Sequence, residues 1–341
     1  MPVNSAIAPT AVSKRAADIV ELAPVYKLVE QDFVAVNALI PKQLTSDVDL
    51  VEEIGHHIIE SGGKRLRPLM VLLAANCCGY TGNDHIRLAA IIEFLHTATL
   101  LHDDVVDRSD LRRGRTTANA IWGNAPSVLV GDFLYSRAFQ LMVEMHNMDI
   151  MAILSDATNT IAEGEVMQLA NVGNRNVNEK QYMEVIRCKT ALLFQAATHT
   201  AAVLACDETT TIAALRDFGL HFGLAYQLVD DWLDYAGDSE VMGKNVGADL
   251  AEGKLTLPLI HALAHTSGRN LARIDKALAG KSSTCLDDII NIVRDSGALD
   301  YTRSAARTQT ELAITCLEVL PDSDYRNAME TLTHFCVARL S

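Results

Sequence analysis

Apolar residues recur along most of this chain at the three- and four-residue spacing of a helix face, while strict alternation of apolar and polar residues is nearly absent. The pattern predicts helices at about 24–40, 46–60, 67–78, 84–107, 126–145, 150–169, 178–204, 209–235 and 255–265, with several more between 285 and 338. Glycine-containing polar clusters separate them, without a proline- or serine-rich linker. We therefore expect one all-α domain over 24–341, a helical bundle, preceded by a mobile tail over 1–23.

Composition narrows the class of protein. The 341 residues are 49% hydrophobic and carry a net charge of −14, which excludes a disordered chain and argues against a nucleic-acid partner. We expect no stable membrane insertion, because no stretch of about 18 apolar residues is present. The N-terminus lacks the apolar core of a signal peptide, and the cysteines include no CxxC pair. These features favour reduced cysteines and a cytoplasmic location.

The predicted helix 84–107 carries acidic residues at its C-terminal end. Asp103 and Asp107 are one turn apart and face the same way. His96 lies before them in the chain, on the same face of the predicted helix. Carboxylates at that spacing repel one another unless they share a cation, and Mg²⁺ prefers such oxygen ligands together with substrate phosphates. For one such cluster alone, a solvated acidic helix end would be an equally good interpretation.

The same arrangement occurs a second time. Asp230, Asp231 and Asp234 lie near the end of the predicted helix 209–235, with Gln227 one turn before Asp231. Both clusters lie at the negative end of a helix macrodipole, where acids are disfavoured. Two such clusters in apolar helices make solvated ends improbable and predict a metal site.

Basic residues gather at positions suited to phosphate groups. Lys64, Arg65 and Arg67 crowd the predicted start of a helix, where free backbone N–H groups also favour an anion. Arg112 and Arg113 are adjacent and point in different directions, so they could serve two separate anions. Further candidates are Lys189 with Thr190, and a glycine-rich segment that contains Lys244, Asp249 and Lys254. Together with the paired carboxylates and the apolar interior, these sites predict an enzyme that acts on a diphosphate attached to a hydrocarbon.

From about residue 24 onward, the chain resembles the trans-polyprenyl diphosphate synthases, most of all the bacterial group that makes octaprenyl diphosphate. The motifs that match in order and spacing are GGKRLRP, EFLHTATLLHDDVVD, SDLRRG, GDFLYSRAF, AEGE, CKTALLF, YQLVDDWLDY and GKNVGADLAEGK. The resemblance implies an isoprenoid-synthase-type bundle around a central apolar cavity, usually a homodimer. It implies a prenyltransferase that uses two or three Mg²⁺ ions and elongates an allylic diphosphate, such as farnesyl diphosphate, by trans condensation with isopentenyl diphosphate.

The resemblance also implies a role for each matching residue. As ligands of isopentenyl diphosphate it implies Lys64, Arg67, His96 and Arg113. As ligands of the allylic diphosphate it implies Arg112, Lys189, Thr190, Gln227, Lys244 and Lys254. As metal ligands it implies Asp103, Asp107, Asp230, Asp231 and Asp234, with Asp104 in support. The catalytic set would be Asp103, Asp104, Asp107, Lys189, Asp230 and Asp231. Arg108 departs from the pattern, because an acid is expected after DDVVD.

Product length should depend on the depth of the cavity. Ala98 and Thr99 lie five and four residues before Asp103, and both are small enough for a growing tail to pass. Short-chain relatives carry bulky aromatic residues near these positions, so we expect a product of about C40 for quinone side chains. The floor of the cavity could involve Phe139 or Met142, for which core packing is an equally good interpretation.

Three alternatives stay open at this point. The chain could make a product of another length, or it could be a non-catalytic isoprenoid-binding partner subunit. The subunit would be expected to have lost aspartates or basic residues that are complete here. A class I terpene cyclase shares the aspartate-rich metal site, but the GGKRLRP motif for a second diphosphate argues against it.

Overall fold

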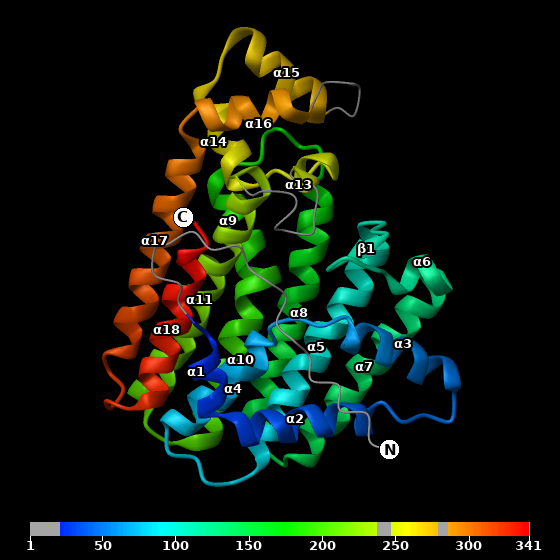
Figure 1. Cartoon of the computed structure of the whole chain (residues 1–341), viewed down its shortest axis with the longest axis vertical. Coiled ribbons are helices and arrows are strands. Elements are labelled where there is room, and N and C mark those ends of the chain that lie inside the picture. Colours follow the sequence, from blue (N-terminus) through cyan, green and yellow to red (C-terminus); the bar gives the residue numbers. More distant parts are fainter. Residues whose placement is uncertain (1–20, 237–246, 279–285, 341) are drawn as a thin grey trace.

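The computed structural model describes residues 21–236, 247–278 and 286–340. The described chain is a bundle of helices with one small hairpin (Figure 1). The elements are α1 (Ala23–Leu28), α2 (Glu30–Gln43), α3 (Asp49–Glu60), α4 (Leu66–Cys77), α5 (Asp84–Val106), β1 (Leu111–Arg112), β2 (Arg115–Thr116), α6 (Ala118–Trp122), α7 (Asn124–Glu144), α8 (Met148–Asn171), α9 (Glu179–Ile186), the π-helix η1 (Arg187–Ala191), α10 (Leu192–Ala205), α11 (Thr209–Ala236), α13 (Ala248–Ala251), α14 (Leu257–His265), α15 (Gly268–Leu278), α16 (Leu286–Asp295), α17 (Ala298–Leu317) and α18 (Asp324–Ala338).

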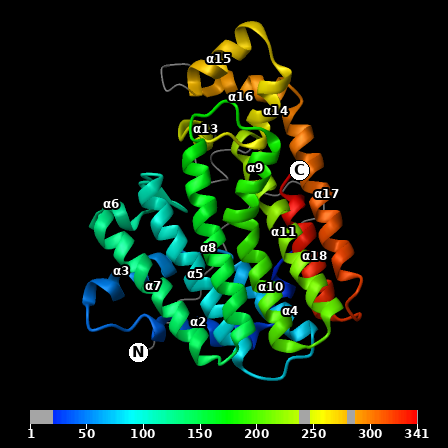
Figure 2. The ribbon, with the colours of Figure 1, turned by 180° about the vertical axis from the view of Figure 1, so that it is seen from behind.

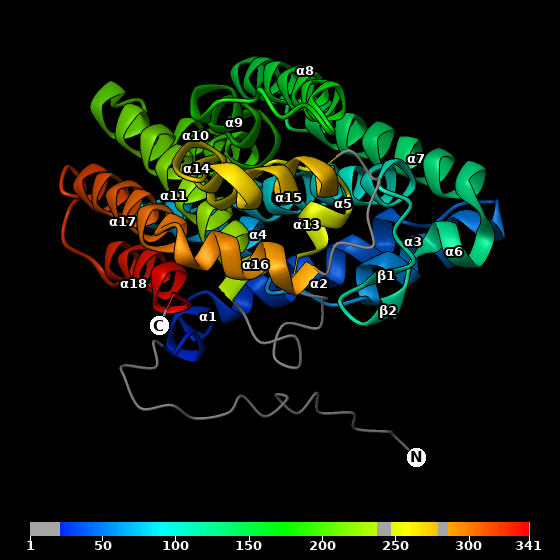
Figure 3. The ribbon, with the colours of Figure 1, turned by 90° about the horizontal axis from the view of Figure 1, so that it is seen from above.

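The most apolar helices form the centre of the bundle. Helix α4 is buried along almost its whole length because it is apolar on every side. It packs against α5 and α10, while α11 packs against α10 and α17. Seen from behind, α8, α10 and α11 run roughly along the long axis (Figure 2), and the view from above places α4 and α5 between α2 and α8 (Figure 3). A second apolar cluster joins the C-terminal part of α11 to α14, α16 and α17.

The structure ends both acid-bearing helices where the sequence predicts. Helix α5 ends at Val106 and α11 is described as far as Ala236, so both acidic clusters lie near the C-terminal end of the described helix. Arg108 has a φ of 52°, and the backbone N–H of the next residue, Ser109, donates to the carbonyl of Asp104 at 2.9 Å. The unexpected arginine therefore occupies a left-handed position that closes the helix end. The β1–β2 hairpin follows and returns the chain toward α5.

Several boundaries differ from the sequence-based expectation. The segment predicted as one helix over 24–40 divides at Val29, whose φ of −116° is not helical. The predicted helix 178–204 contains the five-residue π-helix η1. Helices α6, α13 and α15 and the hairpin were not predicted, because they are short or bury too few apolar residues to give a clear period.

Three other expectations can be compared with the structure only over the described residues. Most of the predicted tail 1–23 lies outside the described residues. In the described ranges, no helix combines the length and apolar character needed to cross a membrane. The six described cysteines carry free thiols.

Candidate active site

Two helices bring the acidic clusters to a shared chamber. Asp103 of α5 and Asp107, which directly follows this helix, line a pocket of about 160 Å³ together with Asp231 of α11 and Asp249 of α13. A larger pocket of about 480 Å³ adjoins it, since Asp103, Asp231 and Asp249 line both. Carboxylates more than a hundred residues apart in the sequence therefore face one another across a common space.

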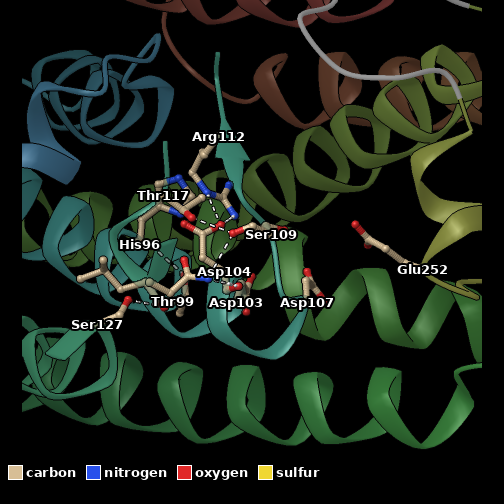
Figure 4. Close-up of polar contacts among 12 residues, drawn as sticks. His96, Thr99, Asp103, Asp104, Asp107, Ser109, Arg112, Thr117, Ser127 and Glu252 are labelled. Carbon is tan, nitrogen blue, oxygen red and sulfur yellow. Dashed lines mark hydrogen bonds and ion pairs between the residues drawn. The ribbon is translucent and has the colours of Figure 1, made fainter. Parts of the chain in front are cut away.

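A lysine neutralises the outer acid of the first cluster. Nζ of Lys254 lies 2.9 Å from Oδ2 of Asp107 and 2.7 Å from Oε2 of Glu252. Asp107 and Glu252 lie on opposite sides of the gap at the end of α5 (Figure 4). Burial opposes the charge of Lys254, but Asp107 and Glu252 together raise its pKa above the ordinary value. Lys254 is therefore charged and occupies the space beside a predicted metal ligand.

A second lysine lies against the inner acid of that cluster. Nζ of Lys189 is 3.5 Å from Oδ2 of Asp103, 2.5 Å from Oε2 of Glu165 and 2.8 Å from Oε1 of Gln168. Burial, and next the charge of Asp103, raise the pKa of Glu165 to about 7. Glu165 and Gln168 are not predicted as site residues from the sequence, although Glu165 belongs to the AEGE motif.

Neutral donors hold the buried acid of the second cluster. Asp231 is only 3% exposed, and its Oδ2 accepts a hydrogen bond of 2.5 Å from the Tyr182 hydroxyl. Its Oδ1 accepts a bond of 2.7 Å from Nε2 of Gln227, whose Oε1 accepts from Thr190 at 2.7 Å. Burial, and next the charge of Asp249, raise the pKa of Asp231. Tyr182 was not proposed from the sequence, although it lies seven residues before Lys189 and so on nearly the same helix face.

The other two acids of this cluster have different partners. Oδ1 of Asp230 lies 2.8 Å from Nη2 of Arg339, which follows the C-terminal helix α18. Asp234 accepts hydrogen bonds from the backbone N–H groups of Ala248 at 3.1 Å and Asp249 at 3.3 Å. Asp234 therefore holds the start of α13 in place, which positions Asp249 at the chamber.

The residues expected to bind isopentenyl diphosphate lie together in a pocket of about 360 Å³. Lys64, Arg67, His96 and Arg113 all line it. The guanidinium of Arg67 lies 4.0 Å from the ring centroid of Phe194, and its Nη1 is 3.4 Å from Nε2 of His96. Burial lowers the pKa of Arg67 to about 10, and burial with the charge of Arg67 lowers that of His96 well below its usual range.

This basic pocket has an unsatisfied polar atom. Nε of Arg67 is buried and has no hydrogen-bond partner in the described part of the chain. An unpaired buried donor is costly, and an oxyanion would satisfy it while neutralising the neighbouring cations. The pocket also includes Tyr226 and Arg339, which the sequence analysis did not propose.

The adjacent arginines take different positions. Arg112 of β1 donates to Oδ1 of the buried Asp104, from Nε at 2.8 Å and from Nη2 at 2.7 Å (Figure 4). Asp104 therefore supports Arg112, which lines the larger pocket. Arg113 reaches the basic pocket beside Gly63, where an added Cβ would lie 2.7 Å from the Arg113 Cζ. Glycine is therefore needed at position 63 for this placement.

Lys189 and Thr190 lie on the π-helix η1, between two closely packed helices. A Cβ added to Gly164 of α8 would lie 2.7 Å from the Cβ of Cys188. A Cβ added to Gly223 of α11 would lie 2.5 Å from the Cα of Ala191. π-Helical turns often occur at functional sites, and here two glycines let the neighbouring backbones approach this one.

The residues expected to control product length lie in or beside the bundle core. Thr99 lines the larger pocket and a more apolar one between α5, α7 and α8. Ala98 and Met142 are buried, and Phe139 is partly buried against the main core. Lys244, expected at the allylic diphosphate, lies outside the described residues.

The acids are arranged for a metal that a diphosphate helps to bind. Among the described residues, no group of three or more histidine, cysteine, aspartate or glutamate side chains is close enough to hold an ion by itself. The carboxylates instead face one another across the pocket that also contains Lys189 and Lys254. Mg²⁺ is commonly bound by one or two carboxylates plus substrate phosphates, so the donor set fits that ion with a bound diphosphate.

Comparison with known proteins indicates the same family as the sequence motifs, over nearly the whole chain. Residues 48–295 match the family model described as polyprenyl synthetase. The octaprenyl diphosphate synthase of Escherichia coli K12 is 48% identical over 319 residues, covering 93% of this chain and 99% of the relative. An all-trans-nonaprenyl-diphosphate synthase of Rhodobacter capsulatus is 49% identical over 313 residues, covering 92% and 96%.

Solved structures agree with the sequence relatives. A polyprenyl synthase from Caulobacter crescentus, complexed with calcium and isoprenyl diphosphate, has a TM-score of 0.90 and 44% identity, covering 94% of this chain and 98% of that one. A decaprenyl diphosphate synthase from Rhodobacter capsulatus has a TM-score of 0.90 and 43% identity, covering 94% and 100%. The predicted isoprenoid synthase fold is therefore confirmed. The chain belongs to the polyprenyl synthetase family and is a prenyltransferase.

Proposed function

We propose that this enzyme elongates farnesyl diphosphate by successive trans condensations with isopentenyl diphosphate, giving octaprenyl diphosphate for quinone side chains. The observation that carries the proposal is the contact between two anion-binding pockets. Arg67, His96 and Arg113 line both the basic pocket and the larger acidic chamber. Two diphosphate substrates bound there would have adjacent reactive ends, which a condensation requires.

The acidic clusters would hold Mg²⁺ through Asp103 and Asp107 on one side and Asp230 and Asp231 on the other, with Asp234 supporting the second cluster. When bound with the allylic diphosphate, Mg²⁺ supplies positive charge that stabilises the leaving diphosphate. Lys189, Lys254 and Arg112 surround the same space and add fixed positive charge. Thr190 and Gln227, which are hydrogen-bonded to each other, orient this end of the allylic substrate.

The basic pocket would position the second substrate. Lys64, Arg67 and Arg113 bind the diphosphate of isopentenyl diphosphate, and the neutral imidazole of His96 contributes a hydrogen bond. The double bond of isopentenyl diphosphate then faces the first carbon of the allylic substrate. The new carbon–carbon bond forms there as the carbon–oxygen bond to the allylic diphosphate breaks. The released diphosphate accepts the proton lost in the final step. Apolar walls exclude water that would capture the allylic cation.

The proposed C40 product draws on the relatives and on the size of the residues near Asp103. Octaprenyl diphosphate synthases of Escherichia coli and Haemophilus influenzae are 48% and 46% identical to this chain. A nonaprenyl synthase is equally similar, so chain length has to be measured. Ala98 and Thr99 leave the wall below Asp103 without a bulky side chain.

The test is incubation with farnesyl diphosphate, isopentenyl diphosphate and Mg²⁺, followed by mass measurement of the products. We expect octaprenyl diphosphate as the main product and turnover below detection for Asp103→Ala. Asp84→Ala, in the first turn at the other end of the same helix, is the matched control and should keep normal turnover. Near-normal condensation by Asp103→Ala would contradict the metal site, and a different main product would contradict C40.

We also propose that the enzyme is a homodimer that pairs through the outer face of α7. Leu129 and Val143 of this helix are 65% and 58% exposed, and Val166 of the neighbouring α8 is 67% exposed. Large apolar side chains exposed on the outer helices can mark an interface. A second copy is the proposed occupant because family membership implies a homodimer.

A further inference from the structure

We propose that Tyr182 is a positioning residue that holds the Asp231 carboxylate for the magnesium–diphosphate complex. The inference deepens the proposed function and rests on it. Tyr182 lies on α9, is buried, and lines the pocket that contains Asp103, Asp107 and Asp231. None of the motif positions that imply a ligand includes it.

The geometry limits the movement of Asp231. The hydroxyl of Tyr182 donates to Oδ2 at 2.5 Å from α9, and the amide of Gln227 donates to Oδ1 at 2.7 Å from one turn earlier on α11. Each carboxylate oxygen thus has its own donor, so rotation of the carboxylate would break one of the two bonds. The lone pairs that these bonds leave open have a defined direction.

The two donors that hold Asp231 are uncharged. Both the phenol and the amide are neutral, whereas Asp103 and Asp107 of the first cluster have lysines beside them. A neutral donor orients a carboxylate without cancelling the negative charge that attracts a cation. The Asp231 carboxylate is therefore held by two uncharged groups, whereas lysines lie against Asp103 and Asp107.

Local structure fixes Tyr182 in turn. Helix α9 begins with a capping box in which Asn178 and Gln181 exchange hydrogen bonds of 3.0 Å. Its other end continues directly into η1, which carries Lys189 to Asp103. One continuous helical segment therefore reaches the second cluster through Tyr182 and the first through Lys189, and sets their relative position.

The test is Tyr182→Phe, which removes one buried hydroxyl. The first readout needs no turnover: the increase in unfolding temperature caused by Mg²⁺ with inorganic diphosphate. The second is the dependence of condensation on Mg²⁺ concentration. We expect the apparent Mg²⁺ affinity to fall by about tenfold or more, as for other groups that orient metal ligands, and kcat at saturating Mg²⁺ to fall less.

The chain offers a matched control. Tyr301 of α17 also donates its hydroxyl to a carboxylate, that of Glu179 on α9, at 2.8 and 3.0 Å, but it lies outside the pockets of the site. Tyr301→Phe should keep the Mg²⁺ dependence of the wild type. If Tyr182→Phe shows the same unchanged dependence, the proposal is overturned.

A double variant separates positioning from a general loss of folding. In Asp231→Asn, the carboxylate that Tyr182 orients is gone, so adding Tyr182→Phe should weaken Mg²⁺–diphosphate binding no further. Independent, additive losses would overturn the proposal. A wild-type enzyme that forms no polyprenyl product would contradict the proposed function alone, because the stabilisation by Mg²⁺ and diphosphate would still report on Tyr182.

Discussion

Arg67, His96 and Arg113 form a group of basic residues that line one pocket. Burial lowers the pKa of Arg67 to about 10, which still leaves it charged at neutral pH, whereas His96 is neutral. The carboxylate of Glu93, which lines the same pocket, offsets part of this charge. This excess of buried positive charge supports the proposal that the pocket binds a diphosphate.

The first residue-scale prediction concerns Gly63. Gly63→Ala should raise the KM for isopentenyl diphosphate about tenfold or more, with a smaller effect on kcat, because the new methyl group displaces the Arg113 guanidinium. Gly62→Ala is the control, since Gly62 also has a positive φ, of 80°, but nothing lies within 4 Å of its added Cβ. Steady-state kinetics with varied isopentenyl diphosphate measures both. An equal rise in KM in both variants would show that strain in the loop is responsible, and an unchanged KM in Gly63→Ala would contradict the role of Arg113.

At the scale of elements, η1 is the clearest case of a local irregularity tied to the site. It turns Lys189 and Thr190 into the chamber between α8 and α11, and the close approach of those helices depends on Gly164 and Gly223. Gly164→Ala should therefore cost about 1–3 kcal/mol of stability through overpacking. It should also raise the KM for the allylic diphosphate, because the backbone of Lys189 has to move.

The control for Gly164→Ala is Gly219→Ala. Gly219 also packs tightly, since its added Cβ would lie 2.6 Å from the carbonyl oxygen of Phe194, but it contacts α10 beyond η1. It should lose comparable stability and keep a nearly normal KM. Thermal unfolding and steady-state kinetics of both variants make the comparison, and an unchanged KM in Gly164→Ala would separate η1 from substrate binding.

The sequence predicts much of this architecture because the site uses regular helices. The i, i+4 spacing of Asp103 and Asp107 and the apolar stripes around them place both acidic clusters at helix ends. The π-helix is not predictable from the period, because its five residues are too few to define a period of their own. Tyr182 and Arg339 are missed for another reason: each reaches the site through tertiary contacts with Asp231 and Asp230 that the sequence does not show.

At the scale of the whole molecule, product length should follow from the depth of the bundle below Asp103. Ala98 is fully buried, so Ala98→Phe would place an aromatic ring in the wall beneath the allylic site. We expect shorter products, measured by mass after incubation with farnesyl and isopentenyl diphosphates. Ala98→Ser, with little added volume, should keep the wild-type length. An unchanged product in Ala98→Phe would place the tail elsewhere.

The assembly gives a second prediction at this scale. Leu129→Arg would put a charge on the outer face of α7, where Leu129 is 65% exposed. In sedimentation experiments we expect the wild type to be a dimer and this variant to dissociate. Val319→Arg is the control, because Val319 is 56% exposed after α17, far along the chain from α7. A variant that stays dimeric would contradict pairing through α7.

The lysine contacts at Asp103 and Asp107 have a practical consequence. Because internal ammonium groups already balance these carboxylates, the fold does not depend on a divalent ion to relieve their repulsion. A chelator should therefore remove the bound divalent ion without unfolding the enzyme, and returning the ion should restore activity. Inhibitors of the basic pocket could then be screened against the metal-free, folded and inactive protein.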